Sequence, residues 1–201
     1  MNPEFVERER SELFKISVLD KYMVGHNGFI AGGCIKNLFS NGRIKDIDVF
    51  FENQEDFHKA QRYFEANEEY KKHYENPKVV AFRELKTNQV VELIKTTYGT
   101  PEEIISKFDF SITKFAYYKE TDEDSTTYKI IHHKDFFEHL HLKKLVLNRE
   151  ILFPVSTFER SLRYTSYGYG LCRESKINLL NAIRTTDDTE LVSRNLYFGM
   201  D

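Results

Sequence analysis

The segment that most constrains the fold is FIAGGCIKNLFSNGRIKDIDVFFEN, residues 29–53. A short apolar run ends there in two glycines, and the next apolar run carries Asp46 and Asp48. Side chains two residues apart in a strand point to the same face, so the two aspartates converge while Ile47 and Val49 enter the core. Two such close carboxylates repel each other unless a cation lies between them. Oxygen-only ligands favour Mg²⁺ or Mn²⁺, so the pattern predicts a divalent metal site.

The glycine pair predicts an anion site beside these carboxylates. Gly32 and Gly33 have no Cβ, which lets a phosphate approach the backbone N–H groups at the start of the following helix, where the dipole also favours an anion. Metal-binding carboxylates next to a phosphate cradle suit a nucleoside triphosphate with its magnesium ion. The chemistry that we expect is in-line transfer of a phosphoryl or nucleotidyl group.

The order of elements predicts an α+β fold. Strands and helices mix over residues 1–135, which we expect to form a core with a mixed sheet and flanking helices. Residues 136–201 are mainly helical in pattern and are expected to pack on that core. The pattern also predicts one amphipathic helix from Phe5 to Met23, a strand from Phe110 to Tyr118, and partial disorder after Thr185.

Charge, cysteine content and hydropathy limit the cellular compartments and the classes of binding partner that we expect for this protein. The formal net charge is −3 and the isoelectric point about 6.2, so no global basic field attracts nucleic acid. Cys34 and Cys172 lie far apart without zinc-type spacing, which suits a reducing compartment. No apolar run approaches the ~20 residues that span a bilayer, and the N-terminus is too charged for a signal peptide. We therefore expect a cytoplasmic protein without a membrane partner.

The same segment resembles the nucleotidyltransferases of the DNA polymerase beta superfamily, which share a Gly-Gly turn, an Asp-x-Asp strand and a third carboxylate on a neighbouring strand. GGCIKN, residues 32–37, is similar to the GGxVRD segment of the poly(A)-polymerase and CCA-adding branch. Lys36 stands at the arginine of that segment and keeps its charge without its bidentate fork. Asn37 replaces the aspartate, which leaves the RNA substrate of that branch in question.

A second likeness is to small nucleotidyltransferase-like proteins of bacteriophages and large DNA viruses. Its residues are ELI at 92–94, YGTPEEI at 98–104 and FDF at 108–110. The third carboxylate that this resemblance implies is Asp109, with Glu92 as the alternative. Asp46, Asp48 and Asp109 would then hold the metal, while Gly32, Gly33 and Lys36 would hold the triphosphate.

The resemblance implies an enzyme that moves a nucleoside monophosphate from a triphosphate to an acceptor hydroxyl and releases pyrophosphate. RNA is one candidate acceptor, and a phage-encoded protein would act in the host cytoplasm. The alternative is an inactive member of the fold that binds a nucleotide or a partner protein. A third reading is an RNA-binding protein that uses a basic and aromatic set of residues: Arg160, Arg163, Lys176, Tyr164, Tyr167 and Tyr169. The sequence leaves the nucleotide, the acceptor and the oligomeric state open.

Overall fold

The computed structural model describes residues 4–122, 125–148 and 150–186 of the 201-residue chain. The sequence predicts partial disorder after Thr185. Residues 187–201 lie outside the described part of the chain. Within it, no helix is both long and apolar enough to cross a membrane.

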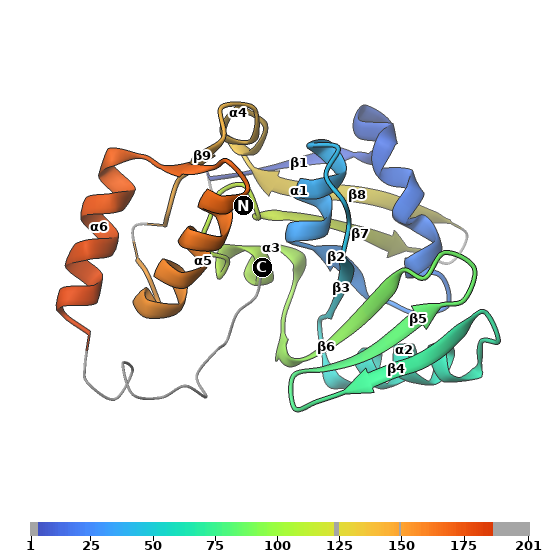
Figure 1. The fold of residues 1–201 in the computed structure, drawn as a ribbon. Helices are drawn as coiled ribbons and strands as arrows, with labels where there is room; N and C mark the ends of the chain where they lie inside the picture. The colour runs from blue at the N-terminus through green and yellow to red at the C-terminus, as the bar shows by residue number, and fades with distance from the viewer. Residues whose placement is uncertain (1–3, 123–124, 149, 187–201) are drawn as a thin grey trace.

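Eight of the described strands form one mixed sheet in the order β1-β8-β7-β2-β3-β6-β5-β4 (Figure 1). The strands are β1 (Phe5–Glu9), β2 (Phe29–Ala31), β3 (Asp46–Phe51), β4 (Tyr70–Glu75), β5 (Val79–Glu84), β6 (Val90–Tyr98), β7 (Phe115–Thr121) and β8 (Thr126–His133). In this sheet β3 and β6 run parallel, and the other described pairs are antiparallel. The mixed sheet with flanking helices confirms the expected fold class.

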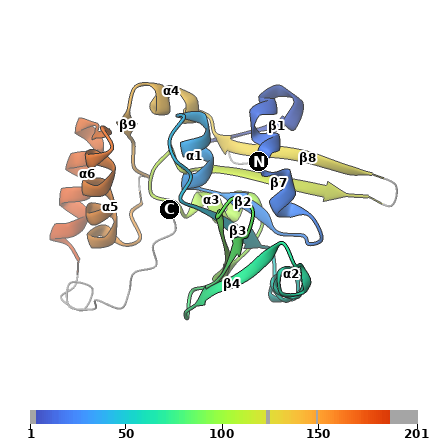
Figure 2. The same cartoon turned by 45° about the vertical axis from the view of Figure 1, so that its right-hand side comes forward.

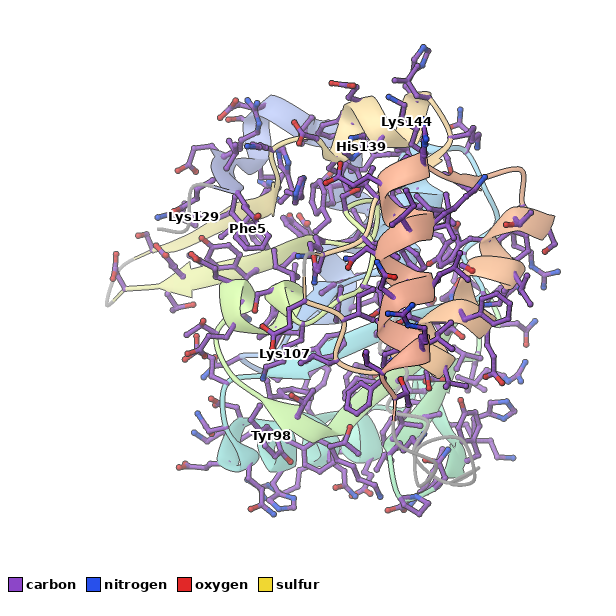
Figure 3. The ribbon with its side chains drawn as sticks, turned by 90° about the vertical axis from the view of Figure 1, so that its left-hand side faces the viewer. Phe5, Tyr98, Lys107, Lys129, His139 and Lys144 are labelled. Carbon is purple, nitrogen blue, oxygen red and sulfur yellow. The ribbon has the colours of Figure 1, made fainter. Side chains whose placement is uncertain are left out.

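Seven helices accompany the sheet in the part of the chain that the structure describes. They are η1 (Arg10–Met23, a 3₁₀ helix), α1 (Gly33–Phe39), α2 (Gln54–Ala66), α3 (Pro101–Ser106), α4 (Phe136–His141), α5 (Pro154–Ser166) and α6 (Arg173–Arg184), with the short strands β9 (Lys144–Leu145) and β10 (Gly170–Leu171) between the last three. Figure 2 shows α2 alongside β4, at the end of the sheet remote from β1. Figure 3 views the molecule from the side of α5 and α6.

Strand alternation divides the buried residues between the two faces of the sheet. Ile47, Val49 and Phe51 of β3 enter the core that η1 and α2 cover. Phe50 enters a second core on the opposite face, together with Ile94 of β6 and the residues of α3. Asp46 and Asp48 have the parity of Phe50, so they lie on the α3 face of the sheet.

The predicted helix over Phe5–Met23 is wrong in its first five residues. Residues 5–9 form β1, which pairs antiparallel with β8 and buries Phe5. The edge of β8 offers these residues a complete backbone ladder, and this tertiary pairing overrides the helical spacing. The remainder is helical, but of the 3₁₀ type with a kink at Leu13.

The strand predicted over Phe110–Tyr118 begins only at Phe115. Before it, the amide of Ser111 bonds to the carbonyl of Val146 and the amide of Thr113 to that of Phe110, which makes a turn. Strand β4 was not predicted at all, because its exposed and charged sequence YKKHYE has no apolar alternation.

Helices α4 and α5 contribute to the main buried cluster of the sheet. Phe136, Leu140 and Tyr164 belong to the same buried cluster as Ile30 and Val49 of the sheet. The division of the chain at residue 135, directly before Phe136, remains a prediction.

Candidate active site

Three carboxylates lie side by side on the α3 face of the sheet. Asp46 and Asp48 come from β3, and Glu92 of β6 is the register partner of Asp48. Burial, with the charges of Asp46 and Glu92, raises the pKa of Asp48 well above its usual range. Burial and Asp46 also raise the pKa of Glu92, although a hydrogen bond from Tyr74 acts in the opposite direction. The electrostatic conflict inferred from the Asp-x-Asp pattern is therefore present, with Glu92 as its third member.

This donor set suits a hard divalent cation. Carboxylate oxygens are the ligands that Mg²⁺ and Mn²⁺ take, and a cation between them would relieve the repulsion that raises these pKa values. With the side chains as they stand, the described residues contain no group of three His, Cys, Asp or Glu side chains arranged around one metal position. The residues present fit the ion in the chemistry of their donor atoms.

The glycine pair makes the turn from β2 into α1. Gly32 has φ +87° and ψ −141°, a conformation that is open essentially to glycine alone. Its amide donates to the carbonyl of Phe115 at 3.1 Å, so this N–H is already engaged in the sheet. Gly33, the first residue of α1, lines the cleft that contains Asp46 and Asp48.

Lys36 lies one turn into α1 and is buried, with 4% of its surface exposed. Its Nζ lies over the rings of Tyr164 at 5.1 Å, Tyr169 at 5.3 Å and Tyr167 at 5.8 Å. Burial and the nearby charges of Lys143, Arg163 and Lys45 lower its pKa to about 8. Aromatic faces hold the ammonium, but they offer no counter-charge, so an anion in the cleft would supply one.

The lowered pKa of Lys36 predicts a pH-dependent affinity for triphosphates. The ammonium is charged below about pH 8 and loses its charge above it. We expect the affinity for magnesium–triphosphate to fall about tenfold between pH 7 and 9.5, a range in which the triphosphate itself is ionised. Lys36→Arg, which stays charged, should remove this fall, and Lys36→Met should bind weakly at both pH values. Calorimetric titration measures these affinities; a wild-type affinity that is flat with pH would contradict the role of Lys36.

Asp109 lines the same cleft, but its carboxylate forms an ion pair with Arg160. Nε of Arg160 in α5 donates to Oδ2 of Asp109 at 2.6 Å, and Nη2 of Arg160 contacts the same oxygen. Both side chains are nearly buried. Burial raises the pKa of Asp109, although the charge of Arg160 lowers it. The ion pair joins the segment after α3 to the C-terminal helices.

The cleft has a volume of about 580 Å³ and lies between the α3 face of the sheet and α5. It brings together most of the predicted residues: Gly33, Lys36, Asp46, Asp48, Glu92 and Asp109. Arg160, Arg163, Tyr164 and Tyr167 of the basic and aromatic set also line it. Sequence reasoning missed Tyr74, which comes from the unpredicted β4, and Lys45, which directly precedes the Asp-x-Asp strand.

The sheet, the glycine turn and the carboxylate row are parts of a nucleotidyltransferase fold. Solved structures support this at the level of the fold. A CCA-adding enzyme in complex with CTP superposes with a TM-score of 0.64 at 16% identity, covering 89% of this chain and 47% of the other. The Thermotoga maritima CCA-adding enzyme complexed with tRNA gives a TM-score of 0.59 at 16% identity, covering 89% and 46%.

The chain belongs to the Gabija anti-defense 2 family, whose family model matches residues 6–143. A protein of Bacillus phage SPbetaL7, called Gabija anti-defense 2, is 25% identical over 159 residues, which are 77% of this chain and 37% of the phage protein. The chain thus spans little more than a third of this relative and about half of the CCA-adding enzymes. The resemblance to phage proteins and to the CCA-adding branch is confirmed.

Proposed function

We propose that this chain is a metal-dependent nucleotidyltransferase that moves a nucleoside monophosphate from a triphosphate to an acceptor hydroxyl. The observation that carries the proposal is the row of Asp46, Asp48 and Glu92 in one cleft with Gly33 and the buried ammonium of Lys36. Acids with raised pKa values share this cleft with a buried ammonium that forms no ion pair among the described residues, and this combination suits a substrate that is itself a metal–phosphate complex.

The roles follow from these positions. Asp46, Asp48 and Glu92 would hold Mg²⁺ or Mn²⁺, which when bound stabilises charge on the attacking and leaving oxygens. Gly33 and Lys36 bind the triphosphate, next to the turn that Gly32 makes. Glu92, which lies beside Asp48 at the edge of the row that faces β5, accepts the proton of the attacking hydroxyl. We assign the third carboxylate to Glu92 rather than Asp109, because Arg160 holds the Asp109 carboxylate.

The family sets the biological context of the proposal. We infer that the protein is phage-encoded, acts in the host cytoplasm and counteracts the Gabija defence through nucleotidyl transfer. The acceptor hydroxyl lies on a host or defence component, and RNA remains one candidate because one structural neighbour is in complex with tRNA. Arg163, Tyr164 and Tyr167 line the Lys36 side of the cleft, where they would contact the nucleotide.

The second candidate is a non-catalytic member of the fold that uses the cleft to bind a nucleotide or a defence protein. Two observations favour it: Lys36 and Asn37 depart from the arginine and aspartate of the CCA-adding branch, and the amide of Gly32 is engaged by Phe115. Such a protein would bind its ligand without turnover.

Calorimetry with each ribonucleoside triphosphate, with and without magnesium chloride, separates the two candidates. The enzyme should bind at least one triphosphate tightly only when magnesium is present. It should also release pyrophosphate and label a macromolecule when it is incubated with α-³²P-triphosphates and a cell extract. Binding that ignores the metal, without pyrophosphate release across the extract, would favour the binding protein.

A further inference from the structure

A hydroxyl of the protein itself reaches the carboxylate row. Oη of Tyr74 donates a hydrogen bond to Oε1 of Glu92. Tyr74 lies on the edge strand β4, has 38% of its surface exposed and lines the same cleft as Asp46 and Asp48. Among the described hydrogen bonds, this is the one in which a hydroxyl group donates to a member of the carboxylate row.

A row of register partners across four strands places this hydroxyl. Asp48 of β3 pairs with Glu92 of β6, Glu92 pairs with Ala81 of β5, and Ala81 pairs with Tyr74 of β4. Partners in a ladder share a face, so all four side chains lie on the α3 face of the sheet, where Asp48, Glu92 and Tyr74 line the cleft. Because Ala81 has only a methyl group, the ring of Tyr74 can lie across β5 and bring its hydroxyl to Glu92.

An irregularity in β4 is required for this arrangement. Lys72 pairs with Phe82 and Tyr74 with Ala81, so the ladder shifts between Lys72 and Tyr74 and residue 73 is extra. In a regular ladder His73 would oppose Ala81, and Tyr74 would point to the α2 face. Bulges commonly re-aim a side chain next to a functional site, and this one aims a tyrosine at the carboxylates.

The components also lie in the order that in-line transfer needs. Across the sheet come the glycine turn after β2, Asp46 and Asp48 on β3, Glu92 on β6, and Tyr74 from β4. The triphosphate-binding residues therefore lie on one side of the carboxylates, and the Tyr74 hydroxyl lies on the other, where an attacking oxygen must be.

We propose that Tyr74 is a self-modification site that accepts a nucleoside monophosphate from the bound triphosphate; this inference rests on the proposed transferase activity. The phenolic oxygen attacks the α-phosphorus, and the Oη–P bond forms. The bond from the α-phosphorus to the bridging oxygen breaks, its electron pair leaves with pyrophosphate, and the phenolic proton passes to Glu92. The product is a phosphodiester between Tyr74 and the nucleoside.

The experiment is site mapping of the adduct on the full chain. The protein is incubated with magnesium chloride and each of the four ribonucleoside triphosphates, labelled at the α-phosphate, and is then digested and analysed by peptide mass spectrometry. We expect a nucleoside monophosphate on the peptide that contains Tyr74. Tyr74→Phe should reduce the self-label to the level of Asp48→Asn. The matched control is Tyr70→Phe on the same strand, whose ring packs on Phe64 of the opposite face and whose loss should leave the label unchanged.

The outcomes separate this inference from the proposed function. Wild-type protein that labels an external acceptor or releases pyrophosphate, yet carries no adduct on Tyr74, overturns the self-modification and leaves the transferase intact. An adduct mapped to Thr96 or Thr97, which also line the cleft, overturns it as well. If no triphosphate binds with magnesium, both proposals fail.

Discussion

Asp48→Asn should abolish nucleotidyl transfer and at the same time stabilise the fold. Removal of the carboxylate takes away a metal ligand, which supports several kcal/mol of transition-state stabilisation, so we expect a loss of at least ~10²-fold in turnover. The fold gains because burial, Asp46 and Glu92 disfavour the ionised carboxylate in the metal-free protein. Pyrophosphate release and thermal unfolding without metal measure the two effects.

The pH dependence tests the cause of the stabilisation. The pKa of Asp48 in the folded state is raised above its ordinary value of 3.8, so the native protein loses stability as the pH rises through the folded-state pKa. The advantage of Asp48→Asn should grow as the pH rises above the ordinary value of 3.8 and should disappear below about pH 4. Glu68→Gln, at an exposed position outside the cleft, serves as the control and should change neither property. Wild-type turnover in Asp48→Asn would refute the carboxylate assignment.

Arg160→Met should cause the largest loss of stability, about 3–5 kcal/mol, because it leaves the carboxylate of Asp109 nearly buried without its counter-charge. Urea unfolding measures the change. The double variant Asp109→Asn with Arg160→Met should recover part of the loss, since it removes the uncompensated charge. The pKa of Asp109 should rise further in Arg160→Met, so the deficit should shrink as the pH falls below that raised pKa and the carboxyl becomes protonated.

The matched control for this prediction is Arg163→Met, on the exposed side of the same helix. An exposed arginine is expected to change the free energy of unfolding by no more than about 0.5 kcal/mol. A similar small loss in Arg160→Met would show that the Asp109–Arg160 pair does not join α5 to the core.

The parts of the site that sequence could predict are those encoded by local period and turn chemistry. Asp46 and Asp48 alternate with Ile47 and Val49, so their common face follows from strand geometry alone. Gly32 was expected at the turn because the chain passes directly from a buried strand into a helix, and its positive φ agrees with that expectation.

The other parts of the site could not be predicted, because they depend on which strands become neighbours in the sheet. Glu92 and Asp109 are both acids near apolar runs, and only the parallel pairing of β3 with β6 puts Glu92 beside Asp48. Arg160, which holds Asp109, is 51 residues away along the chain. Tyr74 depends on a bulge in an exposed edge strand, for which the sequence YKKHYE gives no signal.

Because β3 and β6 run parallel, sequence changes in the segment that connects them can occur without changes at the carboxylates that the two strands carry. Parallel neighbours need a long crossover, and here that excursion consists of α2, β4 and β5. Insertions and substitutions in it can reshape the wall where an incoming hydroxyl lies without altering the register of Asp48 and Glu92. We therefore expect homologous proteins to diverge in their targets along this excursion while they retain one unchanged reaction centre.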